Sequence, residues 1–222
     1  MAINKAYSTY VEGLLSLFTV DNDTLKILLV RKTTEPYKGY WVLPGSMIKN
    51  EETIEDNMSN IIYDKLGIKS IYIEQSHTYS TIGRYPDERV IAVNHIGLID
   101  SVTLLLKREQ RDNVETEWFP IGDLPKLGYD HADIIEKTIQ ILGKKLTNIN
   151  YVRNLFPSDF TLPEMERVLT SVLGAKIDRR NFRKRLLKLD VIVETGEHDD
   201  SGSGRPAKLY RFRDDIKDVN II

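Results

Sequence analysis

The sequence predicts an α+β protein of two domains, a larger domain built around a β-sheet and a small, mainly helical domain at the C-terminal end. Three observations lead to this prediction. Runs rich in β-branched and aromatic residues alternate with helical patterns over roughly the first 145 residues. The remaining residues contain two helical patterns in succession and then a short ribbon of strands. A length of 222 residues fits one domain of about 150 residues together with a small one.

The composition is that of a globular protein, with 41% hydrophobic and 29% charged residues. The sequence has no run of about 18 apolar residues, and its start lacks the apolar core of a signal peptide, so we expect a cytoplasmic protein without a membrane partner. The lack of cysteine excludes disulfides and thiolate metal ligands. Charge is unevenly divided, because residues 151–222 contain 14 Lys and Arg against 12 Asp and Glu, whereas the first 150 residues have a net charge of −4.

Five β-rich runs predict strands in the larger domain. The first two, Val11–Val20 and Leu25–Arg31, are separated by the turn-forming sequence DNDT and predict a hairpin. Further strands are expected near Ser70–Tyr79, Arg89–Ile99 and Val114–Phe119. Together these runs indicate a sheet at the centre of the domain.

Two amphipathic helices are expected beside this sheet. Thr53–Leu66 has a helix-capping threonine at its start, Asp56 three residues later and Gly67 at its end. A second helix begins at Asp130. The residues expected to face inward from this second helix are Ile134, Ile135, Thr138, Ile139 and Leu142.

The pattern changes at GKKLTNINY, which places the domain boundary between residues 148 and 149. Thr161, with Glu164 three residues later, predicts the start of a helix that ends at Gly174, and Asp178 caps a second helix. The short strands VIVE and KLYRF follow, joined by the loop TGEHDDSGSGRPA. Helix, turn, helix and a two-stranded ribbon is the order of a winged helix, a form of helix-turn-helix that binds DNA.

One stretch of the larger domain, LPGSMIKNEETIEDNMSNIIYDKLGI, resembles the Nudix box, G-x5-E-x7-R-E-U-x-E-E-x-G-U, in which U is apolar. The resemblance implies a Nudix-like α-β-α sandwich with a mixed sheet in residues 1–148. A second frame, starting from Gly45 and Glu51, restores no more carboxylates and misplaces the closing glycine. In the frame that keeps this glycine in register, the motif positions are taken by Ser46, Glu52, Asn60, Ile61, Asp64 and Lys65.

These substitutions predict that the box has lost its metal chemistry. Pyrophosphate hydrolysis uses divalent cations, and Mg²⁺ takes hard oxygen ligands. Ile61 has no donor atom where the family has a glutamate, and Lys65 adds a charge of the wrong sign, which leaves Asp64 and Glu52. We therefore expect no catalytic residue, no metal ligand and no cofactor, with Mg²⁺ relevant only if hydrolase activity is retained.

A Nudix cleft without its metal still offers a binding site, and the family commonly binds nucleoside diphosphates linked to another group. Arg84 and Arg89 lie in TIGRYPDERVI, which resembles the arginine-containing segment of ADP-ribose-type members, and a guanidinium suits a diphosphate. Tyr40 and Trp41 are suited to stack on a base or a sugar, and Arg31 completes the predicted effector-binding set. The alternatives are solvated arginines at strand ends and a core position for Trp41.

The second helix of the tail has an apolar side and a basic side. Phe182, Leu186 and Leu189 fall together at helical spacing and predict the packing face. The opposite side is suited to the major groove, where arginine and asparagine recognise bases and lysine holds phosphates. The predicted DNA-binding residues, including two from the loop, are Arg179, Arg180, Asn181, Arg183, Lys184, Lys188, Arg205 and Lys208. The alternative is a solvated amphipathic helix.

Together the two domains resemble the Nudix-related transcriptional regulators of bacteria over nearly the whole chain. Some members control NAD metabolism with ADP-ribose as effector, and related ones control sugar use and bind a sugar such as arabinose. The resemblance implies a homodimeric, ligand-responsive repressor that binds a palindromic operator in double-stranded DNA. Two rival hypotheses are an active ADP-ribose pyrophosphatase with an accessory DNA-binding domain, and an adaptor whose basic helix binds an acidic protein.

Overall fold

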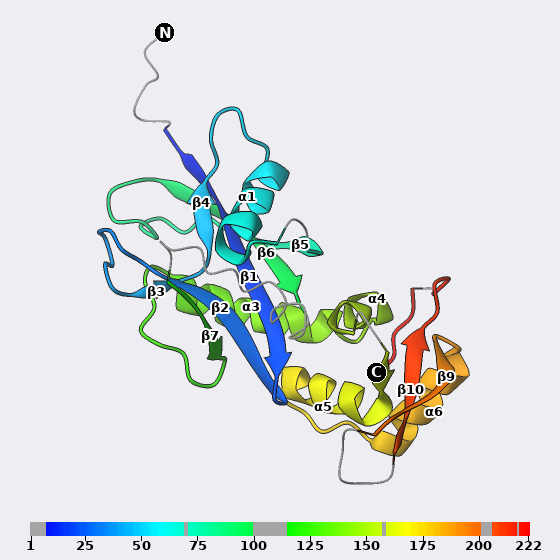
Figure 1. The fold of residues 1–222 in the computed structure, drawn as a ribbon. Coiled ribbons are helices and arrows are strands. Elements are labelled where there is room, and N and C mark those ends of the chain that lie inside the picture. The colour runs from blue at the N-terminus through cyan, green and yellow to red at the C-terminus, as the bar shows by residue number, and fades with distance from the viewer. Residues whose placement is uncertain (1–7, 69–70, 100–114, 157–158, 201–205, 217) are drawn as a thin grey trace. The chain divides into compact units, whose positions relative to one another are not determined.

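The contacts of the chain divide it into two compact units, one formed by residues 1–18 and 26–140 and the other by residues 19–25 and 141–222. The predicted boundary between residues 148 and 149 stays a prediction. The structure, a computed structural model, describes residues 8–68, 71–99, 115–156, 159–200, 206–216 and 218–222 (Figure 1).

The first unit contains a mixed seven-stranded sheet, which confirms the fold class implied by the resemblance. Its strands are β1 (Tyr10–Asp21), β2 (Thr24–Arg31), β3 (Trp41–Val42), β4 (Gly45–Met47), β5 (Ile73–Tyr79), β6 (Val90–Leu98) and β7 (Thr116–Pro120). The main order is β3-β2-β1-β6-β5, with β4 paired to β1 and β7 paired to β2. β1 and β6 are parallel, whereas β5 is antiparallel to β6.

Five of these strands match the sequence predictions to within a few residues, but β3 and β4 were not predicted. They are two and three residues long, too short to show an alternating pattern. Their pairing comes from neighbours in the fold, since β3 lies against the end of β2 and β4 against the start of β1.

Helix α1 (Ile54–Leu66) packs on one face of the sheet. Met58, Ile61 and Ile62 are buried in a cluster with Leu15 and Leu17 of β1. Because side chains alternate along a strand, residues 14, 16 and 18 of β1 point to the opposite face. The apolar stripe of α1 therefore contributes directly to the core, at about 25 cal/mol per Å² of apolar surface buried.

Helix α3 (His131–Lys145) contacts the opposite face of the sheet through a buried chain of polar side chains. Ser16 Oγ donates to Asn94 Oδ1 at 3.0 Å, and Asn94 Nδ2 donates to Thr138 Oγ1 at 3.0 Å. The predicted inward positions Ile134, Ile135, Thr138 and Leu142 are buried, and Ile139 is half-buried. Buried polar groups that are fully paired in this way favour one packing arrangement over others.

The predicted helix caps are present. Thr53 and Asp56 form a reciprocal capping box at the start of α1, and Gly67 ends the helix with a left-handed φ of 67°. A residue with a side chain is disfavoured at such a φ, which explains the glycine. Thr161 and Glu164 form the same box at the start of α5 (Leu162–Leu173).

The second unit has the helices and ribbon of a winged helix. Helix α6 (Arg179–Leu189) follows α5, and β9 (Ile192–Asp199) pairs with β10 (Ala207–Phe212). The predicted two-stranded ribbon is a three-stranded sheet, because β8 (Phe160–Thr161) pairs with β10. β9 also extends through five residues assigned to the loop. The short helices α4 (Ile149–Val152) and η2 (Arg153–Leu155) were not predicted.

Helices within the described ranges are all too short or too polar to cross a membrane.

The burial of Ile61 yields a first prediction. Its side chain is 3% exposed, so Ile61→Glu, which restores a carboxylate to the box, places a charge in the apolar core. We expect a loss of more than about 3 kcal/mol in the free energy of unfolding, measured by urea denaturation. Ser59→Glu on the exposed side of α1 is the matched control, with an expected change of about 0.5 kcal/mol. Equal stability of the two variants would contradict the packing described here.

Candidate functional site

The loop before α1 is organised around the carboxylate of Glu52. Its Oε1 accepts from Asn60 Nδ2 at 2.8 Å, and its Oε2 accepts from Asn57 Nδ2 at 3.0 Å and from the Lys49 backbone N–H at 3.1 Å. Hydrogen bonds from Asn57, Lys49 and Asn60 lower the pKa of Glu52, so the group is ionised at neutral pH. The carboxylate is thus satisfied by protein donors.

In the frame of the box that begins at Ser46, some of these contacts join predicted motif positions. Asn60, in the place of the box arginine, bonds to Glu52, and Asn57 Nδ2 also donates to Ser46 Oγ at 3.0 Å. Asp64 is exposed and Lys65 half-buried. An open pocket of about 390 Å³ at this place is lined by Lys49, Glu51, Glu52, Asp56, Ser59 and Asn60.

These residues are a poor fit for Mg²⁺. Within the described residues, no three His, Cys, Asp or Glu side chains are grouped so that they could hold a metal ion. Glu52 already accepts three N–H bonds, and Ile61 is buried among apolar side chains. A divalent cation here would have to displace amide donors and would still lack oxygen ligands.

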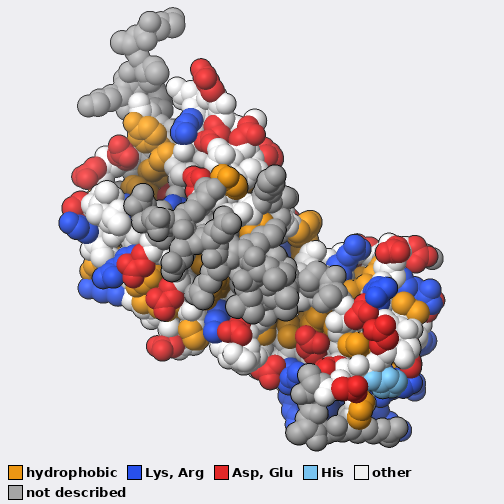
Figure 2. Space-filling view, viewed as in Figure 1, with side chains coloured by type: hydrophobic (Ala, Val, Ile, Leu, Met, Phe, Trp, Pro, Cys, Tyr) orange, Lys and Arg blue, Asp and Glu red, His pale blue; other side chains and the backbone are white. Residues whose placement is uncertain are grey.

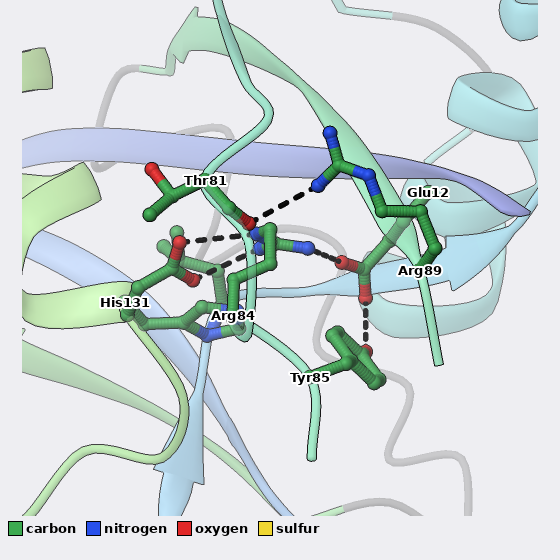
Figure 3. Close-up of polar contacts among 8 residues, drawn as sticks. Glu12, Thr81, Arg84, Tyr85, Arg89 and His131 are labelled. Atoms are coloured by element: carbon green, nitrogen blue, oxygen red, sulfur yellow. Dashed lines mark hydrogen bonds and ion pairs between the residues drawn. The ribbon is translucent and has the colours of Figure 1, made fainter. Parts of the chain in front are cut away.

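A second polar cluster surrounds Arg84, whose side chain is 1% exposed (Figure 3). Arg84 Nη1 donates to Glu12 Oε2 at 3.1 Å, while Nε and Nη2 donate to the two oxygens of Asp130 at 3.0 and 2.9 Å. Tyr85 Oη donates to Glu12 Oε1 at 2.8 Å. The cluster joins β1, the loop before β6 and the start of α3.

The Arg84 guanidinium is charged in this cluster. Burial acts to lower the pKa of Arg84, but the hydrogen bonds and charges of Asp130 and Glu12 outweigh it, and the pKa is raised. Burial raises the pKa of Glu12, opposed by the Tyr85 hydrogen bond and the Arg84 charge. Burial, with the nearby charge of Glu12, also raises the pKa of Tyr85, which therefore stays protonated as a donor.

His131 is buried beside this cluster and has a structural contact. Its Nδ1 accepts from the Leu43 backbone N–H at 2.9 Å. Burial lowers the pKa of His131 to about 3, so the ring is neutral at physiological pH and its Nδ1 lone pair is available. The contact fixes the segment between β3 and β4 against α3.

The predicted effector residues are distributed over two places. Arg31 and Trp41 are cross-strand partners in the β2–β3 pair, and Trp41 packs edge-on against Phe119 with ring centroids 4.7 Å apart. Arg31 forms an exposed ion pair with Glu115. Arg84 is enclosed by carboxylates, and a ligand would have to displace one of them to reach it. Arg89 Nη1 donates to the Thr81 carbonyl at 3.2 Å (Figure 3).

Three tyrosines that the sequence reasoning missed connect these two places. Tyr37 contacts Tyr40 and Tyr129 with ring centroids 5.5 and 4.7 Å apart, and Tyr129 stacks on Tyr85 at 4.4 Å. Lys126 Nζ lies 4.5 Å from the centre of the Tyr40 ring. The available signal was the recurrence of tyrosine in the loop sequences EPYKGYW, GRYPD and LGYDH. The aromatic row runs from Tyr40 to the Arg84 cluster.

In the second unit, α6 has a buried side formed by Phe182 and Leu186, as predicted, with Leu189 half-buried. Asp178 caps the helix by accepting from the backbone N–H groups of Arg180 and Asn181 at 3.0 and 3.1 Å. This cap satisfies backbone N–H groups of the first turn and so stabilises the start of the helix.

Three of the predicted DNA-binding side chains have protein partners. Asn181 Nδ2 donates to Asp178 Oδ2 at 3.0 Å, Arg179 pairs with Glu166 at 2.7 Å, and Lys208 pairs with Glu194 at 2.7 Å. Arg205 lies outside the described residues. The role of each in DNA binding stays a prediction.

The remaining four cations form the exposed basic face of α6. We define this face as Arg180, Arg183, Lys184 and Lys188, which are all exposed. Across the ranges that the structure describes, none of these side chains has a hydrogen bond or ion pair to the protein. Arg183 also lines a pocket of about 700 Å³ together with Lys208 of β10, so helix and ribbon contribute to one surface. In Figure 2, blue side chains are interspersed with red and orange ones over the part of the molecule that contains α6 and the ribbon.

The buried position of Arg84 yields a second prediction. Arg84→Met leaves Glu12 and Asp130 without their common cation, and we expect a loss of about 3–5 kcal/mol in the free energy of unfolding. Arg89→Met removes one hydrogen bond to a carbonyl and should cost about 1 kcal/mol. Chemical denaturation of both variants checks this difference. A loss below about 1 kcal/mol for Arg84→Met would show that the cluster does not stabilise the fold.

Two family models match the sequence. The NUDIX domain matches residues 15–138, and the NrtR DNA-binding winged helix domain matches residues 152–212. The ADPR responsive transcriptional repressor NtrR of Acinetobacter baylyi is 29% identical over 204 residues, which cover 89% of this chain and 80% of the relative.

Solved structures agree with these matches. Shewanella oneidensis NrtR complexed with a 27mer DNA is similar with a TM-score of 0.80 and 28% identity, covering 91% of this chain and 93% of that one. The NUDIX domain of S. oneidensis NrtR, complexed with ADP ribose, has a TM-score of 0.53 and 26% identity, covering 62% of this chain and 92% of that one. With a mixed-sheet first unit and a winged-helix second unit that both match, the chain belongs to the NUDIX family, as one of its Nudix-fused transcriptional regulators of the NrtR type.

Proposed function

We propose that the chain is a transcriptional repressor that binds double-stranded DNA through α6 and the β9–β10 ribbon and responds to ADP-ribose bound by its NUDIX domain. The basic face of α6 carries this proposal, because exposed cations without protein partners are suited to DNA phosphates and base edges. The similarity to a regulator solved with a 27mer DNA extends over 91% of the chain and supports this function over a hydrolase.

The effector is proposed from the chemistry of the NUDIX domain. ADP-ribose has an aromatic base, two riboses and a negatively charged diphosphate. Tyr40 offers a half-buried ring for stacking, Lys126 brings a cation beside that ring, and Arg31 lies across from Trp41 on the adjoining strand. The ADP-ribose complex of a similar domain supports this ligand class. A free sugar such as arabinose is the comparator in the binding experiment.

We further propose that the NUDIX domain binds its ligand without hydrolysing it. The donor set around Glu52 supports this, because its carboxylate accepts three N–H bonds and α1 directs Ile61 into the core. Metal-assisted hydrolysis needs oxygen ligands around a cation that activates water. In the frame described above, the motif positions supply only two carboxylates, Glu52 and Asp64.

The proposed switch is a shift in population between two states of a homodimer. Ligand binding favours a state whose two recognition helices no longer match the spacing of the operator half-sites, about one DNA turn or a multiple of it. A ligand can shift this equilibrium only by its difference in affinity for the two states. ADP-ribose and operator are therefore expected to weaken each other's binding by the same factor.

The third prediction concerns DNA binding. The full chain should bind a duplex selected from a random pool, with an affinity that falls steeply with salt because counterions are released from phosphates. Lys184→Ala should reduce the slope of log K against log salt concentration by about one, measured by fluorescence anisotropy. Lys137→Ala on the exposed side of α3, outside the winged helix, is the control and should leave the slope unchanged. Saturating ADP-ribose should weaken binding, whereas arabinose should leave it unchanged.

Two outcomes would contradict this function. A duplex affinity independent of salt would exclude the phosphate contacts and favour the adaptor hypothesis. Duplex binding that is unchanged by saturating ADP-ribose would remove the proposed effector while leaving the DNA-binding role intact.

The fourth prediction concerns turnover. Incubation of the chain with ADP-ribose and Mg²⁺ should release no AMP above the protein-free background. The amount of AMP is measured by chromatography at intervals over several hours. Release of AMP that requires both the chain and Mg²⁺ would establish the rival function, an ADP-ribose pyrophosphatase.

A further inference from the structure

An apolar side chain lies within the basic face of α6. Leu187 is 48% exposed, although the neighbouring Leu186 is fully buried. At 100° per residue, Leu187 points away from the core between Arg183, one turn earlier, and Arg180, two turns earlier. Lys184, three residues before Leu187, bounds it on the other side. The basic face thus contains one apolar side chain with three cations on its N-terminal side.

The packing of the second unit does not account for this residue. Phe182 and Leu186 define the buried side of α6, and Leu187 points about 100° beyond Leu186. A single exposed leucine is ordinary on a protein surface. Its position next to three exposed cations is what distinguishes it, because the cations attract a polyanion to this face and an apolar protein partner would have to bury them.

An apolar side chain beside exposed cations is suited to a partner that presents an apolar group next to anionic groups. The major groove of DNA meets this description, since phosphates border the groove and the C5-methyl of thymine is an apolar group on its floor. Arginine and lysine on the same helix face can hold the phosphates or guanine edges while a side chain between them reaches a base.

We propose that Leu187 determines operator specificity by contacting the C5-methyl group of a thymine in each half-site. The inference rests on the DNA-binding function proposed above and adds to it a residue that recognises sequence through an apolar contact. It requires no hydrogen-bond donor on Leu187, and it assigns thymine rather than cytosine to one position of each half-site, because cytosine lacks the methyl group.

The experiment combines a change in the protein with a change in the DNA. A duplex that the full chain selects from a random pool is prepared with each thymine replaced in turn by deoxyuridine, which lacks only the methyl group. We expect the wild-type chain to bind one of these duplexes about fourfold more weakly, as burial of a single methyl group implies. Leu187→Ala should bind the unmodified duplex about fourfold or more weakly, and should not distinguish that thymine from deoxyuridine.

Ile82→Ala is the control, because Ile82 is an exposed apolar residue, 87% exposed, and lies in the first unit, outside the winged helix. It should retain the wild-type preference for thymine. The scan with wild-type protein does not depend on the folding of any variant, and thermal melting of Leu187→Ala checks that the variant is folded.

Each contrary result has a distinct meaning. Wild-type binding that is equal on all deoxyuridine duplexes overturns the methyl contact but leaves DNA binding in place. A loss of dimer in Leu187→Ala, with all duplexes affected equally, also overturns it and assigns Leu187 to a contact between copies of the chain. If no duplex is selected from the pool, the DNA-binding function and this inference both fail.

Discussion

Three carboxylates of the NUDIX domain, Glu52, Glu12 and Asp130, are satisfied by hydrogen-bond donors of the protein itself, and both its architecture and its chemistry depend on this constraint. Glu52 accepts from two asparagine amides and a backbone N–H group, whereas Glu12 and Asp130 share the guanidinium of Arg84. Internal donors thereby offset the cost of desolvating these oxygens without a metal ion. Arg84 also joins three segments that are far apart in the sequence. Its ion pairs with Glu12 and Asp130 therefore hold β1, the loop before β6 and the start of α3 together.

In the function proposed above, the altered box keeps the fold of a NUDIX domain without its catalysis. Helix α1 keeps its N-terminal box at Thr53 and its left-handed end at Gly67, and Ile61 strengthens the core at a position the family gives to a glutamate. The domain is therefore suited to hold a diphosphate compound intact. The exposed cations of α6 provide the second surface that a regulator needs, and the buried pair Phe182 and Leu186 fixes which side of the helix these cations occupy.

Features encoded by neighbouring residues were predictable from the sequence, and features that depend on distant contacts were not. The caps at Thr53 and Thr161 and the two sides of α6 follow from spacing within one helix. The environment of Arg84 depends on residues 72 positions before it and 46 positions after it, so the sequence indicated a cation suited to a diphosphate but not its enclosure. Strands of two or three residues, such as β3, β4 and β8, arise from pairing with longer neighbours and leave no periodic pattern. Asn181 donates a hydrogen bond to Asp178, the cap of its own helix. This local contact was not anticipated when Asn181 was predicted to contact bases.

The central claim is that this NUDIX domain binds a diphosphate ligand through protein donors alone. Isothermal titration calorimetry of ADP-ribose into the full chain, performed once with EDTA and once with millimolar Mg²⁺, tests it most directly. The carboxylate arrangement described here predicts the same dissociation constant in both buffers and heats that do not change with time. Binding that occurs only with Mg²⁺ would contradict it, because the cation would then supply the charge that the protein was thought to provide.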